Sequence, residues 1–303
     1  MKPVYGDADW KRAQERVKLC KSASELKGVL RSEASVMATK IEELEMHANR
    51  RLPHKSFWKK LDVKLIERES SHSGGHLETD SARIIFIRAS ENGFRKRFTA
   101  AHEAAHLFLD HFIARHPNAL SRVEEESVCD EFASSLLIPS RKLDGLLDEY
   151  DQLTLEVIHS ISRAFRVNLL PAVIAISQTD RFSQDISFLA KRVGHPSRPN
   201  EIDYRIKCAP HRSIFFLPTN KRIKSLGLGD VCEALSDASP GTIRRGEAED
   251  VCIPLWCRRR GSGTASGLLT WQAQLLGSGE IFALLHTQEL KRQWNPPKKM
   301  RRV

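Results

Sequence analysis

Residues 97–111 read RFTAAHEAAHLFLDH and carry the most informative motif of the chain. Within it, His102 and His106 stand four residues apart, a spacing that places both side chains on one face of a helix, where one metal ion can bind both. Imidazole nitrogens are good zinc ligands, and a catalytic zinc site has three protein ligands and one position for water. Glu103 would lie beside the ion, where its carboxylate can take a proton from a water molecule that attacks a carbonyl. The spacing therefore predicts zinc-dependent hydrolysis.

Small and apolar residues surround the two histidines and indicate that one face of their helix is buried. We expect this helix to run from Thr99 to Ile113, with Thr99 as its N-cap. Two core histidines with hydrogen-bond partners and no metal are the alternative interpretation of the same motif.

A third ligand has to come from outside the five-residue motif. The extended metzincin pattern is absent, because Leu109 and Phe112 stand where it needs glycine and histidine, and His111 is one residue out of register. Asp110 is four residues beyond His106 and shares its face, so it could hold that ligand through a hydrogen bond. The simpler interpretation of Asp110 is a solvated helix end.

A second helix is expected from Val123 to Ile138, and an acidic run, Glu124 to Glu126, opens it. Acidic residues favour the dipole at a helix N-terminus, so the run does not by itself indicate a metal site. At about 100° per residue, Glu125 and Glu126 both project toward the apolar face, and spacing alone leaves both as candidate ligands. Cys129 shares that face, and we expect it to be a small buried apolar residue.

Two motifs of the chain resemble the ImmA/IrrE-type zinc metallopeptidases of bacteria, mobile elements and phages: RFTAAHEAAHLFLDH from Arg97 and ESVCDEFASSLLIP from Glu126. The strand-turn-strand segment before them also matches the family's arrangement, so the resemblance covers about Leu61 to Ser177. It implies a zincin-like fold with gluzincin-like metal binding and Zn²⁺ as the cofactor.

The resemblance also implies roles for individual residues. His102 and His106 would bind zinc, Glu103 would be the general base, and Glu126, at the family's distance before Leu-Leu-Ile-Pro, would be the third ligand. Family members typically cleave a helix-turn-helix repressor of the XRE type and so relieve repression of stress-response or mobile-element genes. The resemblance therefore implies such a repressor as the protein substrate.

The expected fold class is α+β, with a zincin-like core of a small β-sheet and helices. Two strand candidates, LDVKLIERE from Leu61 and ARIIFIRAS from Ala82, flank a Gly-Gly segment and predict a hairpin or meander. Short alternating runs after Ser177 predict a small β-rich domain, which faintly resembles GAF-related sensor domains. The predicted boundaries are a helical region at 1–50, the core at 51–150, a helix-turn-helix-like segment at 151–180, the basic β-rich domain at 181–290 and a mobile basic tail at 291–303.

The charge is distributed unevenly along the 303 residues. Residues 181–303 hold 21 Lys and Arg against 11 Asp and Glu, which accounts for the whole net charge of +10, whereas the first 180 residues hold 27 of each. A basic region can recruit an acidic protein partner or contact nucleic acid, and Arg258-Arg259-Arg260 beside Trp256 would suit the latter. We expect recruitment of a protein, with nucleic acid secondary.

Composition and chain pattern exclude several classes of protein. With 41% hydrophobic and 28% charged residues the chain is neither disordered nor collagen-like. The longest apolar stretch, Leu169 to Ile176, contains Pro171 and is far shorter than the roughly 20 residues of a membrane span. The polar N-terminus has no secretory signal, so we expect a cytoplasmic protein without membrane partners and with reduced cysteines.

A second, structural zinc site could be formed in the C-terminal part. Its ligands would come from Cys208, His211, Cys232, Cys252 and Cys257. Their spacings fit no ribbon or finger pattern, so buried thiols are the preferred interpretation.

Two functions from different classes fit the sequence. The first is a zinc endopeptidase that acts on a protein substrate. The second is a DNA-binding transcriptional regulator that uses the zincin core as a scaffold, which the basic C-terminal region would support. Glu103 favours the peptidase, because a purely structural metal site would not need it.

Overall fold

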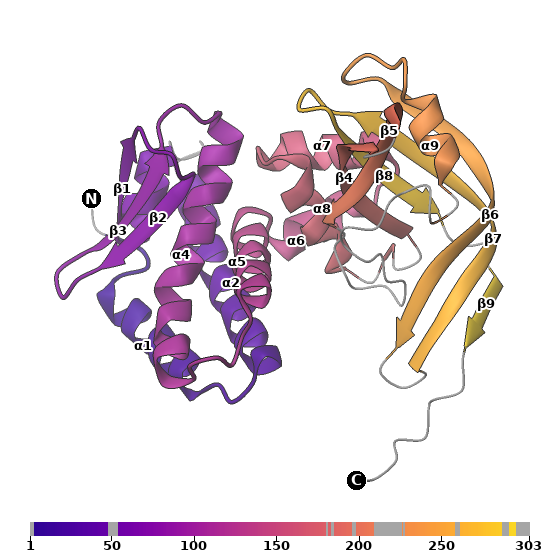
Figure 1. The fold of residues 1–303 in the computed structure, drawn as a ribbon. Coiled ribbons are helices and arrows are strands. Elements are labelled where there is room, and N and C mark those ends of the chain that lie inside the picture. The colour runs from indigo at the N-terminus through magenta and orange to yellow at the C-terminus, as the bar shows by residue number, and fades with distance from the viewer. Residues whose placement is uncertain are drawn as a thin grey trace, which may run out of the picture. The chain divides into compact units, whose positions relative to one another are not determined.

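The fold is α+β, as predicted, and is described here from a computed structural model (Figure 1). The residues described are 3–47, 54–179, 181–182, 185–195, 198–208, 226, 228–257, 261–286 and 291–294. The chain divides into two compact units, of which the first comprises Met1–Glu149 with Ser160–Ala175 and the second Tyr150–His159 with Ile176–Val303. Whether the five segments predicted from the sequence act as separate domains stays a prediction.

The first unit is mainly helical, with a three-stranded sheet near its N-terminal end. Its helices are α1 (Asp7–Leu19), α2 (Ala23–His47), α3 (His54–Lys60), α4 (Gly93–Arg115), α5 (Arg122–Leu137), α6 (Ser140–Leu147), the later part of α7 (Leu155–Phe165) and most of α8 (Leu169–Ser177). The side chain of Ser22 accepts a hydrogen bond from the backbone N–H of Glu25 and so caps α2.

The sheet consists of β1 (Val63–Arg68), β2 (Gly74–Glu78) and β3 (Arg83–Arg88) in the order β1-β3-β2. Strands β1 and β3 are parallel, and β2 is antiparallel to β3. The predicted hairpin or meander is therefore wrong. The Gly-Gly segment is part of a third strand, and the apolar β3 takes the central position, where Ile85 and Ile87 are buried.

Helix α4 begins two turns earlier than the sequence indicates, and the predicted cap at Thr99 is wrong. The N-cap is Asn92, whose side chain accepts a hydrogen bond from the backbone N–H of Arg95. Thr99 lies inside the helix, is buried, and its hydroxyl donates to Glu91 instead. The second predicted helix is confirmed as α5, with Ser121 and Glu124 forming a capping box at its start.

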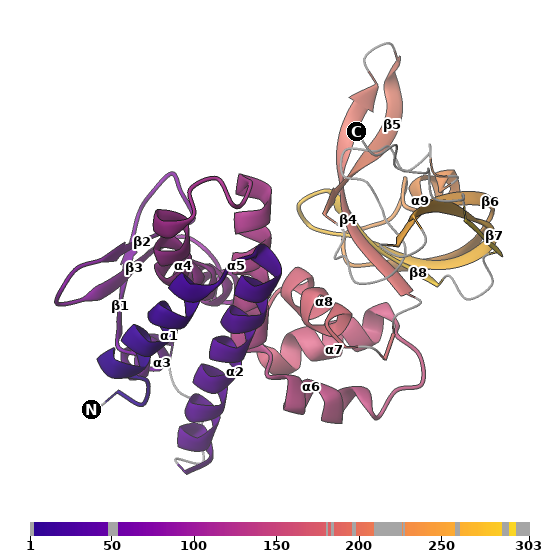
Figure 2. The ribbon, with the colours of Figure 1, turned by 90° about the horizontal axis from the view of Figure 1, so that it is seen from below.

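The N-terminal helices pack on the two helices that carry the motifs (Figure 2). From α1, the Trp10 indole stacks on Phe108 of α4 with the ring centroids 4.4 Å apart, and its N–H donates to the carbonyl of Leu61. From α2, Lys27 and Arg31 both pair with Glu131 of α5. Through these contacts, α1 packs against α4 and α2 packs against α5.

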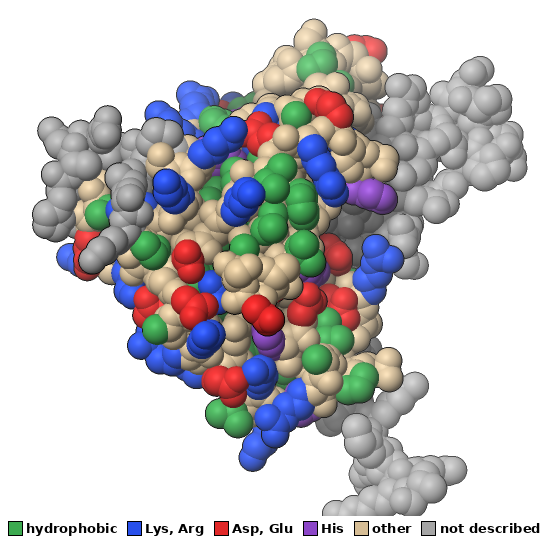
Figure 3. All heavy atoms as spheres, turned by 90° about the vertical axis from the view of Figure 1, so that its left-hand side faces the viewer, with side chains coloured by type: hydrophobic (Ala, Val, Ile, Leu, Met, Phe, Trp, Pro, Cys, Tyr) green, Lys and Arg blue, Asp and Glu red, His purple; other side chains and the backbone are tan. Residues whose placement is uncertain are grey.

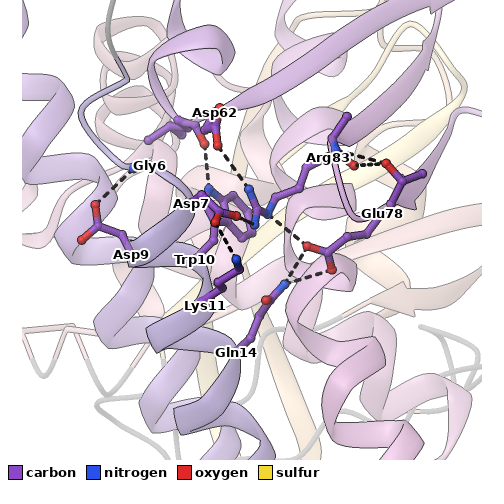
Figure 4. A network of polar contacts seen from close by, with 12 residues as sticks. Gly6, Asp7, Asp9, Trp10, Lys11, Gln14, Asp62, Glu78 and Arg83 are labelled. Carbon is purple, nitrogen blue, oxygen red and sulfur yellow. Dashed lines mark hydrogen bonds and ion pairs between the residues drawn. The ribbon is translucent and has the colours of Figure 1, made fainter.

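A polar network joins α1 to the sheet (Figure 4). Its centre is the buried guanidinium of Arg83 on β3, which pairs with Asp7, Asp62 and Glu78. Gln14 of α1 donates to both carboxylate oxygens of Glu78. Because a buried guanidinium is costly without partners, these carboxylates fix the position of α1 against β2 and β3.

The second unit contains a sheet of antiparallel strands in the order β5-β4-β8-β7-β6, with β9 also paired to β7. Its elements are β4 (Asp185–His195), β5 (Arg198–Cys208), α9 (Gly229–Ala234), β6 (Ile243–Cys257), β7 (Gly261–Leu275), β8 (Glu280–His286) and β9 (Lys291–Trp294). The predicted mobile tail from residue 291 is wrong for its first residues, because Lys291–Trp294 pairs with the first part of β7. Residues 295–303 lie outside the described part of the chain.

Charged side chains of both signs alternate on the surface of the first unit. On the face shown in Figure 3, Lys and Arg lie among Asp and Glu, in keeping with the equal numbers of each in the first 180 residues. Within the described residues, no helix is long and apolar enough to cross a membrane.

Candidate metal centre and active site

The two histidines of the HExxH motif face each other on α4. The Nε2 atoms of His102 and His106 lie 3.3 Å apart, and the rings make an edge contact with centroids at 5.0 Å. Around them α4 presents small buried residues, Ala101, Ala104 and Ala105. The short alanine side chains let α4 pack closely against neighbouring elements.

Helix α5 brings a carboxylate and a thiol to the same place. Oε2 of Glu126 lies 3.3 Å from Nε2 of His102, and the side chain is about half exposed at 51%. One turn later, Cys129 is fully buried, and its Sγ lies within 4.8 Å of the ligand atoms of both histidines. Burial, then the nearby carboxylates beginning with Glu126, raises the pKa of the Cys129 thiol.

These separations fit a zinc ion. Two ligand atoms bound at 2.0–2.1 Å to a tetrahedral zinc ion are about 3.3 Å apart. Both measured separations, from Nε2 of His102 to Nε2 of His106 and to Oε2 of Glu126, have this value. Two imidazoles and a carboxylate are also ligands that zinc accepts. A metal site made of His102, His106 and a residue of α5 is therefore compatible with the structure.

Asp130 holds the ring of His102 from the side away from His106. Its Oδ1 lies 2.8 Å from Nδ1 of His102, so the Nδ1–H donates to the carboxylate and Nε2 keeps its lone pair for an ion. Burial alone would lower the pKa of His102, but the hydrogen bond and charge of Asp130, with Glu103 and Glu126, raise it overall. Burial and the charge of His102 lower the pKa of His106.

Glu103 is held by a histidine of the neighbouring strand β2. Its Oε2 lies 3.0 Å from Nδ1 of His76, while Nε2 of His76 lies 2.9 Å from Oδ2 of Asp110. These hydrogen bonds, that of Asp110 first and that of Glu103 second, raise the pKa of His76 to about 9. The His76 ring also stacks on His106, with centroids 5.1 Å apart and planes 5° from parallel.

The structure thus places Glu126 next to His102, and the three residues whose ligand atoms all lie within 4.8 Å of one another are His102, His106 and Cys129. Asp110 contacts His76 and does not hold a ligand in the way considered from the sequence. His111 lies away from the pair and contacts Glu78, with its Nε2 2.9 Å from Oε2.

Sequence reasoning missed His76, Asp130 and Gly74. Asp130 stands four residues after Glu126, so helical spacing could have placed it on the same face. His76 and Gly74 lie in the Gly-Gly segment between the two predicted strands, and only the pairing of β2 with β3 brings them to α4. For Cys208, His211, Cys252 and Cys257 the side chains lie outside the described part. Cys20, Cys129 and Cys232 are buried thiols outside any disulfide.

Comparison with known proteins supports the resemblance. Residues 59–177 match the model of a peptidase family, the IrrE N-terminal-like domain, which confirms the predicted family for this part of the chain. Peptidases of this family are metallopeptidases, and the match of residues 59–177 suggests a function of that type. No curated protein matches the chain.

Solved structures share the fold. One of them, a Mycobacterium tuberculosis transcriptional regulator, is 13% identical over 92% of this chain and 80% of that chain, with a TM-score of 0.53. Similarity at this identity shows the fold alone.

Proposed function

We propose that this chain, which through residues 59–177 belongs to the peptidase family of IrrE N-terminal-like domains, is a zinc-dependent endopeptidase that cleaves a helix-turn-helix repressor. The observation that carries the proposal is the pair of 3.3 Å separations that relate His102 to His106 and to Glu126, with Glu103 next to them. In this proposal His102, His106 and Glu126 hold the zinc ion.

In this proposal, different residues of the chain have separate roles in hydrolysis. A bound zinc ion would supply Lewis acidity, which lowers the pKa of water to about 7 and polarises the scissile carbonyl. Glu103 accepts a proton from the attacking water and returns it to the leaving amine. Asp130 keeps the Nδ1 proton of His102 in place, so that the ring presents Nε2.

A repressor substrate is supported by the resemblance to repressor-cleaving members and by the charge distribution. Every residue proposed for chemistry lies before Asp180, whereas the whole net charge of +10 lies after it. The C-terminal part therefore suits recruitment of a partner through long-range attraction. We propose that this recruitment, and not chemistry, is its role, and that the protein acts in the cytoplasm.

The test is to incubate the zinc-loaded chain with each helix-turn-helix protein encoded in the same genome and to identify fragments by mass spectrometry. We expect one zinc ion per chain and cleavage of one repressor at a defined bond. Glu103→Gln should retain zinc and cleave about 10²–10⁴-fold more slowly, because an amide cannot accept the proton of water although its shape is nearly unchanged.

Two results would contradict this mechanism. One is a Glu103→Gln variant that cleaves at the wild-type rate, and the other is a His102→Ala/His106→Ala variant with undiminished zinc content. If Glu125→Gln lost zinc and Glu126→Gln did not, the choice of third ligand would be wrong.

The second candidate function, a DNA-binding regulator, is favoured by the concentration of positive charge after Asp180. It predicts tight binding of a defined DNA sequence at physiological salt. It also predicts that Glu103→Gln leaves regulation in cells intact, whereas a peptidase would lose it.

A further inference from the structure

Strand β2 crosses α4 directly over Glu103. A Cβ atom added at Gly74 would lie 2.6 Å from Oε1 of Glu103 and 2.6 Å from Cγ2 of Thr99, much closer than van der Waals contact. The next residue, Gly75, would have no atom within 4 Å of an added Cβ. Because successive strand residues point to opposite sides, Gly74 faces α4 and Gly75 faces away from it.

His76 lies two residues after Gly74 and therefore shares its face of the strand. The ring covers a stripe of α4 formed by Glu103, His106 and Asp110, which have helical i, i+3 and i+7 spacing. Its Nδ1 contacts Oε2 of Glu103 at 3.0 Å, its Nε2 contacts Asp110 at 2.9 Å, and its plane stacks on His106. Three partners thus fix the position of this one imidazole.

Both oxygens of Glu103 are therefore in contact with β2. His76 donates to Oε2, and the backbone of Gly74 lies against Oε1, where any side chain would displace the carboxylate. A glutamate has a flexible side chain, and an unrestrained one would spend much of its time in other rotamers. At 13% exposure the carboxylate is also largely shielded from water that would compete for its hydrogen bonds.

We propose that Gly74 and His76 form a clamp that positions the Glu103 carboxylate for proton transfer. This inference rests on the proposed function, in which Glu103 is the general base. His76 is a positioning residue, since it acts through Glu103, and Asp110 in turn orients His76. The clamp is a Gly-x-His pattern on a strand, and it supplies the precise orientation that general-base catalysis needs.

The competing explanation is that His76 only fastens β2 to α4 through Asp110. Two substitutions separate these roles. In asparagine the amide nitrogen is two bonds from Cβ, as Nδ1 is in histidine, so His76→Asn keeps a donor for Glu103 and loses the one for Asp110. Glutamine carries its amide nitrogen one bond further out, so His76→Gln keeps a donor for Asp110 and loses the one for Glu103.

The experiment compares these variants and Gly74→Ala with the wild type in the zinc-loaded full chain. Gly75→Ala is the matched control, because its added methyl group meets no neighbour. The first readout is the position of the Glu103 side chain in crystal structures, which needs no substrate. The second is the division between kcat and KM for the repressor that the wild type cleaves, with zinc content measured for every variant.

The clamp predicts that His76→Gln and Gly74→Ala displace the Glu103 carboxylate and lower kcat by about 10²-fold, because a misplacement near 1 Å can have such an effect. KM and zinc content should change less than about threefold. His76→Asn should keep the wild-type position of Glu103 and recover most of kcat, and Gly75→Ala should behave as the wild type.

Two outcomes would overturn the clamp. The first is an unmoved Glu103 in His76→Gln, with kcat within about twofold of wild type. The second is an equal loss of kcat in His76→Asn and His76→Gln, which would mean that His76 only fastens β2 to α4. If the wild type cleaves no repressor, the proposed function fails, while the position of Glu103 in the crystal structures still decides whether the clamp exists.

Discussion

Asp130 contacts no substrate in this proposal, yet the zinc affinity should depend on it. Its carboxylate accepts the Nδ1–H of His102 at 2.8 Å and so keeps the ring oriented with Nε2 toward His106 and Glu126. Removing such a partner typically lowers metal affinity by about 10–100-fold. We expect Asp130→Ala to lower zinc affinity by this factor, measured by competition with a chromophoric chelator.

The adjacent Glu131 offers a matched control for Asp130. It pairs with Lys27 and Arg31 of α2, away from the histidines. Glu131→Ala should leave zinc affinity unchanged and reduce only thermal stability. Equal zinc affinity in the wild type and in Asp130→Ala would show that the hydrogen bond to His102 does not orient the ligand.

Cys129 is the other group of α5 close enough to compete as a ligand, since its Sγ lies within 4.8 Å of the ligand atoms of both histidines. If Glu126 and Cys129 both bound the ion, four protein ligands would leave no position for water, as in structural zinc sites. We therefore expect Cys129 to line the site without binding. Cobalt(II)-substituted protein should lack the thiolate-to-cobalt charge-transfer absorption in the near ultraviolet. That absorption, if present and abolished in Cys129→Ala, would make Cys129 a ligand.

For single residues, the sequence was informative wherever the residues concerned lie on the same helix. Spacing alone related His102, Glu103 and His106, because all three lie within two turns of α4. It left Glu125 and Glu126 open, since both project toward the same apolar face, and the structure brings Glu126 to His102. Helix periodicity cannot describe the contact of His76 with Glu103, because that contact joins a strand to a helix 27 residues away.

The short helix α3 should make the fold sensitive to acid. Burial, then the charge of Arg97, lowers the pKa of His54 to about 4, and the indole N–H of Trp58 donates to its Nε2. In the unfolded chain His54 binds a proton as the pH falls through about 6.5. Between pH 6.5 and 4 the unfolded state therefore binds more protons than the folded state, so stability decreases as the pH falls.

His54→Gln tests this dependence, because glutamine can accept a hydrogen bond from Trp58 but does not titrate. We expect its melting temperature to fall less between pH 7 and pH 5 than that of the wild type, with a chelator present so that zinc release contributes to neither. Identical pH dependence in the two proteins would mean that His54 is not held neutral in the folded state.

Sequence patterns identified most of the helices and strands of the first unit, but they did not show how its strands pair in the sheet. The apolar runs predicted β1 and β3, and the spacing of apolar residues from Val123 to Ile138 predicted α5. The order β1-β3-β2 was missed, because the segment with Gly74 and Gly75 has the composition of a turn and becomes a strand only through pairing with β3. The sequence analysis placed the start of α4 at Thr99, although Asn92, whose residue type is at least as favourable at an N-cap, is the observed cap.

On the scale of the whole chain, the boundary between the two units runs through helix α7. Its first residues belong to the second unit, where the N–H of Leu155 donates to Gln272 and Nε2 of His159 contacts Gln274 at 2.6 Å. A chain shortened to end at Ser177 would leave Leu155, which is fully buried, and His159 without these partners. Such a truncation changes stability together with charge, so it cannot test recruitment cleanly.

Charge neutralisation in the full chain tests recruitment without this complication. Lys298, Lys299, Arg301 and Arg302 carry four of the positive charges that follow Asp180 and lie far along the chain from every proposed catalytic residue. Electrostatic steering raises association rates by about 10–10³-fold and weakens with salt. Replacing all four residues by glutamine should therefore lower kcat/KM for the repressor several-fold at low salt, leave kcat and zinc content unchanged, and reduce the dependence of kcat/KM on ionic strength.

A matched variant with glutamine at four exposed basic positions of the first unit, Lys11, Lys55, Arg95 and Arg12, should keep the wild-type salt dependence, because charges of both signs are balanced there. If the two variants lose kcat/KM equally, the attraction depends on total charge and not on the C-terminal region, and the basic region would then have no specific part in substrate capture.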